Sequence, residues 1–244
     1  MFATYLVARK LNNFSVVDVA WAAGFLPIVL FYAVVGEGAF THKMTFVIMM
    51  GVWSFRLGGF LYSRVKRHHP VEDTRYQELR REWSSNLNRK FFWFYQFQAV
   101  LLWLLSAPGA IVSVNKSVDL VLAEWLGAVI WICGLIGESV ADTQAERFKE
   151  DPSNTGKVCQ IGLWRYSRHP NYFFESIIWI GYFVFALGSP KGWVTIYCPA
   201  LILWLLLKVT GIPYSEQRSL KSRGEAYREY QRTTSAFIPL PRKN

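Results

Sequence analysis

Six long apolar runs constrain this chain more than any other feature of its sequence. Each is roughly 17 to 24 residues long, which is enough for a helix to cross a hydrocarbon core of about 30 Å. Backbone polar groups in lipid are satisfied only in helices or closed barrels, and no series of short alternating strands is visible. We therefore predict an all-α, polytopic membrane helical bundle of six or seven spans. The six runs are 16–36, 44–63, 91–114, 119–141, 171–188 and 192–209.

The charged residues are distributed unevenly between the loops. The chain has 244 residues and a net charge of +10. Basic residues gather in the loop 64–90, in the segment 142–170 and in the tail, whereas the other loops contain Lys43, Lys116 and Lys191. This asymmetry predicts that the three basic segments lie on the cytosolic side. The positive charge therefore suits anionic lipid and an anionic cofactor better than nucleic acid.

Several common catalytic and binding motifs are missing from the sequence. The four histidines and the three scattered cysteines lack the spacing of metal ligands, so no metal site is predicted. The sequence contains no GxGxxG motif, no P-loop and no Gly-x-Ser-x-Gly elbow. These absences argue against a Rossmann domain, an NTPase and a serine hydrolase.

A polar turn leads into an apolar helix within residues 162–182. Pro170 suits the first turn of that helix, because its missing N–H has no partner there in any case. Asn171, Glu175 and Trp179 follow at intervals of four residues, so they share one helix face. Polar side chains on an otherwise apolar helix are costly to bury and need partners.

Basic side chains come directly before this face. Arg165, Arg168 and His169 are donors suited to phosphate or carboxylate, and a helix N-terminus also favours an anion. One interpretation is the mouth of an anionic-cofactor site at the membrane surface. The other is a positive-inside anchor before an ordinary span, which leaves Asn171 and Glu175 unexplained.

Two charged residues lie in the earlier spans. Asp18 is either a first-turn carboxylate favoured by the helix dipole or a proton donor that faces a cavity. Ser15 or Asn13 is expected to cap the same helix. Arg56 lies well inside the second span, where it either faces a partner or a wet cavity, or extends to the near interface.

Three local patterns complete the predicted secondary structure. The segment 71–83 has apolar residues at helical spacing and predicts a short amphipathic surface helix. Pro108 is predicted to kink the third span. Residues 1–10 are too short to span and form an interfacial segment, the end of a longer helix or a frayed terminus.

The central stretch carries a resemblance to a known family. Residues 162–175 and 179–182 resemble the signature of the steroid 5-alpha-reductase-like membrane family (3-oxo-5-alpha-steroid 4-dehydrogenase C-terminal-like). More narrowly, they resemble its bacterial-type branch, often labelled as a domain of unknown function. Supporting stretches are 18–21, 53–57, 75–76, 138–149 and 227–239. The resemblance implies one membrane domain over residues 1–244, with a cofactor-binding half at about 138–244.

The family resemblance also implies a cofactor and a reaction. Its reductases hold NADPH at the cytosolic side and transfer a hydride to a carbon–carbon double bond conjugated to a ketone. Asp18, by this likeness, and Arg56, by its place inside an apolar span, are the candidate catalytic residues. The residues expected to bind the cofactor are Arg64, Arg67, Asp142, Arg147, Arg168, His169, Asn171, Tyr172, Glu175, Trp179, Glu216 and Tyr230.

The sequence departs from the steroid reductases at one place. Val17–Asp18 stands where those enzymes carry a Gln–Glu pair, so a lipophilic enone is a better general expectation than a steroid. The alternative is an S-adenosylmethionine-dependent methyltransferase, since Arg168–Tyr172 and the tail also resemble the isoprenylcysteine and phospholipid methyltransferases. A third possibility is a non-catalytic membrane lipid-binding protein. Asn171 followed by Glu175 favours the reductase branch.

These interpretations imply a setting for the protein. We expect a multi-pass integral membrane protein of a bacterial inner membrane or of the endoplasmic reticulum, with its cofactor face in the cytosol. Its partners are expected to be membrane lipids and a lipophilic small-molecule substrate that enters from the bilayer. No required protein partner is evident.

Overall fold

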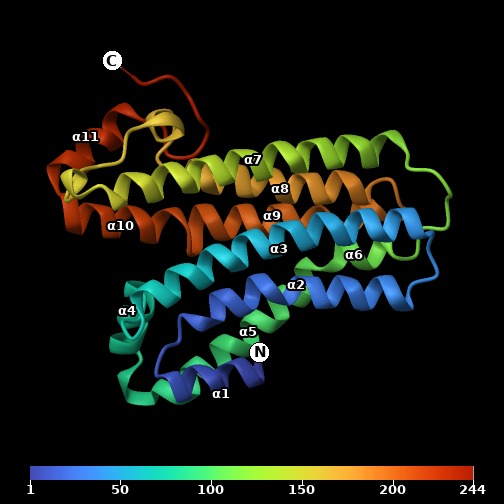
Figure 1. Cartoon of the computed structure of the whole chain (residues 1–244), viewed down its shortest axis with the longest axis horizontal. Coiled ribbons are helices and arrows are strands. Elements are labelled where there is room, and N and C mark those ends of the chain that lie inside the picture. The colour runs from blue at the N-terminus through green and yellow to red at the C-terminus, as the bar shows by residue number, and fades with distance from the viewer. Residues whose placement is uncertain (244) are drawn as a thin grey trace. The chain divides into compact units, whose positions relative to one another are not determined.

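A computed structural model describes residues 1–243, and in those residues helices are joined by short connections without any β-strand (Figure 1). Five helical segments of the described chain are long and apolar enough to cross a membrane, so the predicted all-α, multi-pass architecture is confirmed. They are Val16–Val35, Phe40–His68, Ser84–Val112, Leu122–Glu150 and Gly192–Arg223. The chain divides into two compact units, unit 1 (Met1–Leu120) and unit 2 (Val121–Asn244).

Unit 1 is built around the antiparallel pair α2 and α3, and α5 packs against both α1 and α2. Its elements are α1 (Phe2–Leu11), α2 (Val16–Val35), α3 (Phe40–His68), α4 (Thr74–Glu82), η1 (Ser84–Asn86), α5 (Leu87–Leu105) and α6 (Ala107–Val112). The predicted amphipathic helix is confirmed as α4, with Tyr76 fully buried. The predicted kink near Pro108 is a break at Ser106 between α5 and α6.

Two expectations for unit 1 need correction. Residues 1–10 are not frayed, because α1 buries Tyr5 and Ala8. The loop predicted to start at residue 64 starts later, since α3 continues to His68. Polar residues do not end a helix, whereas a proline does, and Pro70 follows at once.

The predicted side-chain cap of α2 is also wrong. Ser15 stands at the N-cap position but makes no capping hydrogen bond. Its hydroxyl accepts a hydrogen bond from the backbone N–H of Asp73 at 2.9 Å instead. The side chain of Asn13 accepts one from the backbone N–H of Ser15 at 3.0 Å. Both polar groups therefore fix the turn before α2 rather than its first helical turn.

Unit 2 is organised by α7 and α8, which lie side by side over most of their length (Figure 1). Its elements are α7 (Leu122–Glu150), η2 (Pro152–Asn154), η3 (Gly162–Arg165), α8 (Pro170–Ala186), η4 (Gly192–Ile196), α9 (Tyr197–Trp204), η5 (Leu205–Val209), α10 (Ile212–Arg223) and α11 (Glu225–Thr233). Helix α8 begins at Pro170, as predicted. The last predicted run, 192–209, is helical throughout but irregular, with a 3-10 turn before α9 and a π-helical turn after it.

Small residues set the register between α7 and α8. A side chain at Gly127 would clash with the backbone of Phe185, and one at Gly181 would clash with the backbone of Trp131. Farther along, Gly134 lies against Ile178. The two helices are therefore antiparallel and so close at these points that only glycine fits.

Candidate functional site

The α7–α8 register brings polar residues from both helices to one end of the pair. Extending the register by one turn from Gly134 places Glu138 opposite Phe174 and Glu175. A further turn places Asp142 opposite Asn171. This register therefore puts Asp142, Asn171 and Glu175 on facing turns of the pair, and Glu138 joins them.

These polar side chains are held to different degrees. The indole N–H of Trp179 donates to Glu175 Oε1 at 2.8 Å, so this carboxylate has a fixed neighbour on its own helix. Glu138 is buried, whereas Asp142, Asn171 and Glu175 are partly exposed. The carboxamide of Asn171 makes no hydrogen bond to any other residue in the described part of the chain. Its donors and its acceptor are therefore available to a ligand.

Arg168 is occupied by the tail of the chain. Its Nε and Nη2 donate to the two oxygens of Glu216 at 2.7 and 3.2 Å. Its Nη1 donates to the backbone oxygens of Gln231 and Thr234 at 3.1 and 2.5 Å. With its side chain only 11% exposed, this guanidinium fastens the tail to the start of α8.

Glu216 on α10 is the centre of that contact, which we call the tail clamp (Arg168, His169, Glu216, Tyr227 and Gln231). Besides Arg168, its carboxylate accepts hydrogen bonds from His169 Nε2 at 3.0 Å and from the hydroxyl of Tyr227 at 3.1 Å. The side-chain amide of Gln231 also donates to it. Four side chains therefore converge on one carboxylate.

Burial shifts the pKa values of two groups of the tail clamp, His169 and Tyr227. Burial lowers the pKa of His169 below 6.5 and outweighs the opposing effect of its hydrogen bond to Glu216. The imidazole is therefore neutral near pH 7 and donates from Nε2, and its ring stacks on Tyr172 with centroids 5.4 Å apart. Burial and the Glu216 charge raise the pKa of Tyr227 above its usual range, so its phenol remains a donor.

Tyr230 also serves the tail. Its hydroxyl donates to the backbone oxygens of Trp164 and Ser167, and the Ser167 hydroxyl donates to the backbone oxygen of Phe237 at 2.8 Å. Burial raises the pKa of Tyr230 above its usual range. Tyr230 therefore joins α11 to the turn before α8, which is an internal contact at a position predicted to meet the cofactor.

The remaining basic candidates of unit 2 are differently placed. Arg147 near the end of α7 and Arg165 in η3 are both exposed. Neither forms an ion pair or a side-chain hydrogen bond with another described residue. These two guanidinium groups, rather than Arg168, are free to meet an anion.

In unit 1, the candidate acid Asp18 has a specific neighbour. The hydroxyl of Tyr76 in α4 donates to Asp18 Oδ1 at 2.5 Å. Burial raises the pKa of Tyr76 well above its usual value of 10, so the phenol keeps its proton. Asp18 itself is partly exposed. The sequence predicted Asp18 as a polar residue of interest but did not predict this partner.

A polar network holds the segment that precedes α4 against the start of α2. Glu72 accepts a hydrogen bond from the backbone N–H of Phe14 and forms an ion pair with Arg80 at 3.0 Å. Asp73 caps α4 through the backbone N–H of Arg75 at 3.0 Å and pairs with Arg64. Arg64 therefore has a carboxylate partner within unit 1.

Arg56 and Arg67 do not join this network through the hydrogen bonds described above. Arg56 lies within α3 and is partly buried, and Arg67 lies in its last turn and is exposed. Both interact with other residues of the chain. Their predicted catalytic and cofactor-binding roles stay predictions.

Sequence reasoning missed four of the residues that hold these networks together: Glu72, Tyr76, Tyr227 and Gln231. The buried positions of α11 offered a signal, because Tyr227 and Tyr230 are three residues apart and so share a helix face. No local pattern marked Glu72, whose partners lie 58 and 8 residues away in sequence.

Comparison with known proteins identifies the family to which the chain belongs. Residues 4–234 match a protein family described as "Protein of unknown function (DUF1295)". The chain belongs to this family. The prediction of membership in a family labelled as of unknown function is thereby confirmed. The wider likeness to steroid 5-alpha-reductases stays a prediction.

One relative also matches the chain over most of the length of both proteins. It is described as "Uncharacterized protein C594.04c" of Schizosaccharomyces pombe, and it is 25% identical over 259 residues. The match covers 93% of this chain and 73% of the relative. No solved structure shows significant similarity to the chain.

Proposed function

We propose that the protein is an NADPH-dependent membrane reductase that transfers a hydride to a conjugated carbon–carbon double bond of a lipophilic enone. The observation that carries this proposal is the unpartnered carboxamide of Asn171 beside Glu175 and Asp142. An amide offers both donors and an acceptor to a second amide, and a carboxylate accepts from hydroxyl groups. This set therefore fits the carboxamide of nicotinamide and the hydroxyls of its ribose.

The phosphates of such a cofactor need cations. Arg147 and Arg165 are exposed, and a guanidinium holds phosphate with two parallel hydrogen bonds. Arg168 is not proposed for this role, because four hydrogen bonds already fix it to the tail. Arg168 instead positions the start of α8, and with it Asn171.

The proposed chemistry needs a hydride donor and an acid that stabilises charge on the substrate oxygen. When bound, NADPH supplies the hydride. Within unit 1, Asp18 is the proposed acid: its Oδ1 accepts from Tyr76, and its Oδ2 carries a proton that hydrogen-bonds the carbonyl oxygen of the substrate. Charge that develops on that oxygen is thereby stabilised.

The occupied state of Arg168 also favours the alternative cofactor. S-adenosylmethionine has no phosphates and carries a sulfonium cation. The three carboxylates Glu138, Asp142 and Glu175 near the end of the α7–α8 pair suit a cation. The same face is therefore the site that a methyltransferase of the isoprenylcysteine or phospholipid type would use.

Calorimetry on the purified full chain in detergent separates these functions. We expect NADPH to bind, and Asn171→Ala to weaken its binding about fivefold or more, because a neutral hydrogen-bonding group that loses its partner in a semi-buried site costs about 1–3 kcal/mol. Asn88→Ala is the matched control, since the Asn88 side chain is exposed and has no side-chain hydrogen bond to a described residue.

The possible results lead to different conclusions. Binding of NADPH that Asn171→Ala leaves unchanged would remove Asn171 from the cofactor site. Binding of S-adenosylmethionine but not NADPH would replace the reductase with the methyltransferase. Binding of neither would leave the non-catalytic lipid-binding protein as the function to test.

A further inference from the structure

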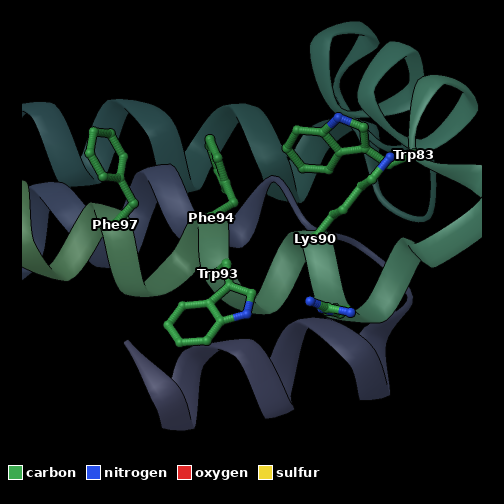
Figure 2. A pocket seen from close by; sticks show the side chains of 6 residues that line it. Trp83, Lys90, Trp93, Phe94 and Phe97 are labelled. Atoms are coloured by element: carbon green, nitrogen blue, oxygen red, sulfur yellow. The ribbon is translucent and has the colours of Figure 1, made fainter.

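An open groove of about 420 Å³ runs along one side of α5 in unit 1 (Figure 2). Its lining consists of four aromatic and two basic side chains: Trp83, Arg89, Lys90, Trp93, Phe94 and Phe97. The groove is separate from both networks described above and takes no part in the proposed reductase chemistry.

The lining is ordered along the helix. Arg89 and Lys90 lie in the first turn of α5, and the aromatic residues of α5 follow on the next two turns. From Lys90 to Phe97 the helix rises about 10 Å. Lys90 extends along the groove toward Trp83, while Phe94 and Phe97 continue in the opposite direction (Figure 2). Charge therefore sits at one end of the groove and apolar surface at the other.

The apolar end of the groove is open to its surroundings. Trp93 is 61% exposed and Phe97 is 55% exposed. Both lie on a helix that is long and apolar enough to cross a membrane. Aromatic side chains at the end of a span sit where acyl chains meet headgroups. An acyl chain is thus the natural neighbour of this surface.

The basic end of the groove carries uncompensated charge. Neither Arg89 nor Lys90 pairs with a carboxylate among residues 1–243. Helix α1 adds two further cations at the same end, because it runs antiparallel to α5. Phe2 packs on Phe92, and the Tyr5 hydroxyl donates to the backbone oxygen of Asn88 at 2.9 Å.

That register carries the last turn of α1, with Arg9 and Lys10, toward the start of α5. Two pairs of basic residues therefore frame the end of the groove. A zwitterionic headgroup gains little from such a site, whereas an anionic headgroup is attracted by every one of these charges.

We propose that this groove is a binding site for an anionic phospholipid. The phosphate of its headgroup contacts Arg89 and Lys90, and one acyl chain lies along Trp93, Phe94 and Phe97. The charge at one end and the exposed aromatic surface at the other are complementary to the two ends of such a lipid.

Native mass spectrometry of the full chain in detergent tests the site with two lipids of equal chain length. We expect dioleoyl-phosphatidylglycerol to bind at least about tenfold more tightly than dioleoyl-phosphatidylcholine, because each basic residue near a headgroup strengthens anionic binding. The double variant Arg89→Gln/Lys90→Gln should lose most of that preference. Trp93→Ala/Phe97→Ala should weaken binding of both lipids to a similar degree.

The matched control is Lys66→Gln/Arg81→Gln, which removes two charges from exposed positions of unit 1 that do not line the groove. The proposal is overturned if the control lowers the preference as much as Arg89→Gln/Lys90→Gln does, or if the groove variants bind both lipids as the natural chain does. Competition by glycerol 3-phosphate would also overturn it, since a soluble phosphate would then be the ligand.

Discussion

The two units fasten a polar segment to the end of a helix by different arrangements. In unit 1, three carboxylates share the contacts: Asp18 accepts from Tyr76, Glu72 accepts from Phe14 and Arg80, and Asp73 binds Arg64 and the start of α4. In unit 2, the single carboxylate of Glu216 accepts from four side chains.

The two arrangements differ in how much is lost when one carboxylate is removed. A network spread over three carboxylates loses one contact at a time, and the others still hold the segment. A single carboxylate that satisfies four donors is coupled to all of them, so its loss leaves several buried polar groups without a partner. Unit 2 is therefore expected to be the more sensitive of the two to one substitution.

The largest effect is expected for Glu216→Gln. This change removes the charge that balances Arg168, whose side chain is 11% exposed, and an uncompensated charge in such a place costs about 3 kcal/mol. We expect a lower unfolding temperature in detergent and faster trypsin cleavage in the tail, at sites such as Arg232 and Arg242.

The control for this prediction is Glu225→Gln, which removes the same charge from an exposed ion pair of the same unit. It should leave both the unfolding temperature and the cleavage rate unchanged. Equal behaviour of the two variants would show that the tail clamp does not hold the tail. Adding Arg168→Gln to Glu216→Gln should recover part of the lost stability, because the unbalanced charge is then gone.

A smaller effect is expected for Tyr76→Phe in unit 1. The substitution removes the hydroxyl that donates to Asp18 and keeps the buried ring, so it costs about 1 kcal/mol. The contacts of Glu72 and Asp73 should keep α4 in place. Thermal unfolding and the protease resistance of residues 64–90 measure this, and release of the whole segment would contradict the distributed arrangement.

The smallest effect is expected from the protonation of His169. Its pKa in the folded protein lies below 6.5, so the unfolded chain binds the proton more readily. This contribution to stability is present above pH 6.5 and is lost as the pH falls below that value. The unfolding temperature should therefore drop more between pH 7.5 and 5.5 in the natural chain than in His169→Gln.

The glutamine variant is a suitable reference because its amide still donates to Glu216. The other three histidines are present in both proteins, so the difference between the two profiles isolates His169. Parallel profiles would mean that His169 is not held neutral by burial.

Five of the six predicted apolar runs correspond to helices long and apolar enough to cross a membrane. The run 171–188 corresponds to α8, which is not among those five, and the polar ends of the helices were predicted less well. The first run, 16–36, corresponds to α2, and the amphipathic segment 71–83 corresponds to α4. Helix α3 outlasts its apolar run because backbone hydrogen bonds continue through polar residues until Pro70 approaches. The length of an apolar run therefore indicates the part of a helix that can cross a membrane, not the full length of the helix.

The sequence predicted several residues of the candidate site, but it did not predict which of them bind one another. Arg168, His169 and Glu216 were expected beside a cofactor, and the structure brings them together as partners of one another. A basic residue before a span has the same appearance in sequence whether it binds a ligand or a distant glutamate. That choice depends on Glu216, which lies 48 residues from Arg168 and follows four further helical elements (α8, η4, α9 and η5).

The part of the tail after Thr233 meets the turn before α8 largely through its own main-chain atoms. Arg168 donates from its guanidinium to the carbonyl of Thr234 and from its backbone N–H to that of Ser235, and the Leu240 N–H donates to the carbonyl of Tyr166. Every residue type except proline offers these same groups. Most substitutions at Thr234, Ser235 and Leu240 therefore keep these hydrogen bonds, whereas a substitution at Arg168 removes the bonds that its guanidinium makes.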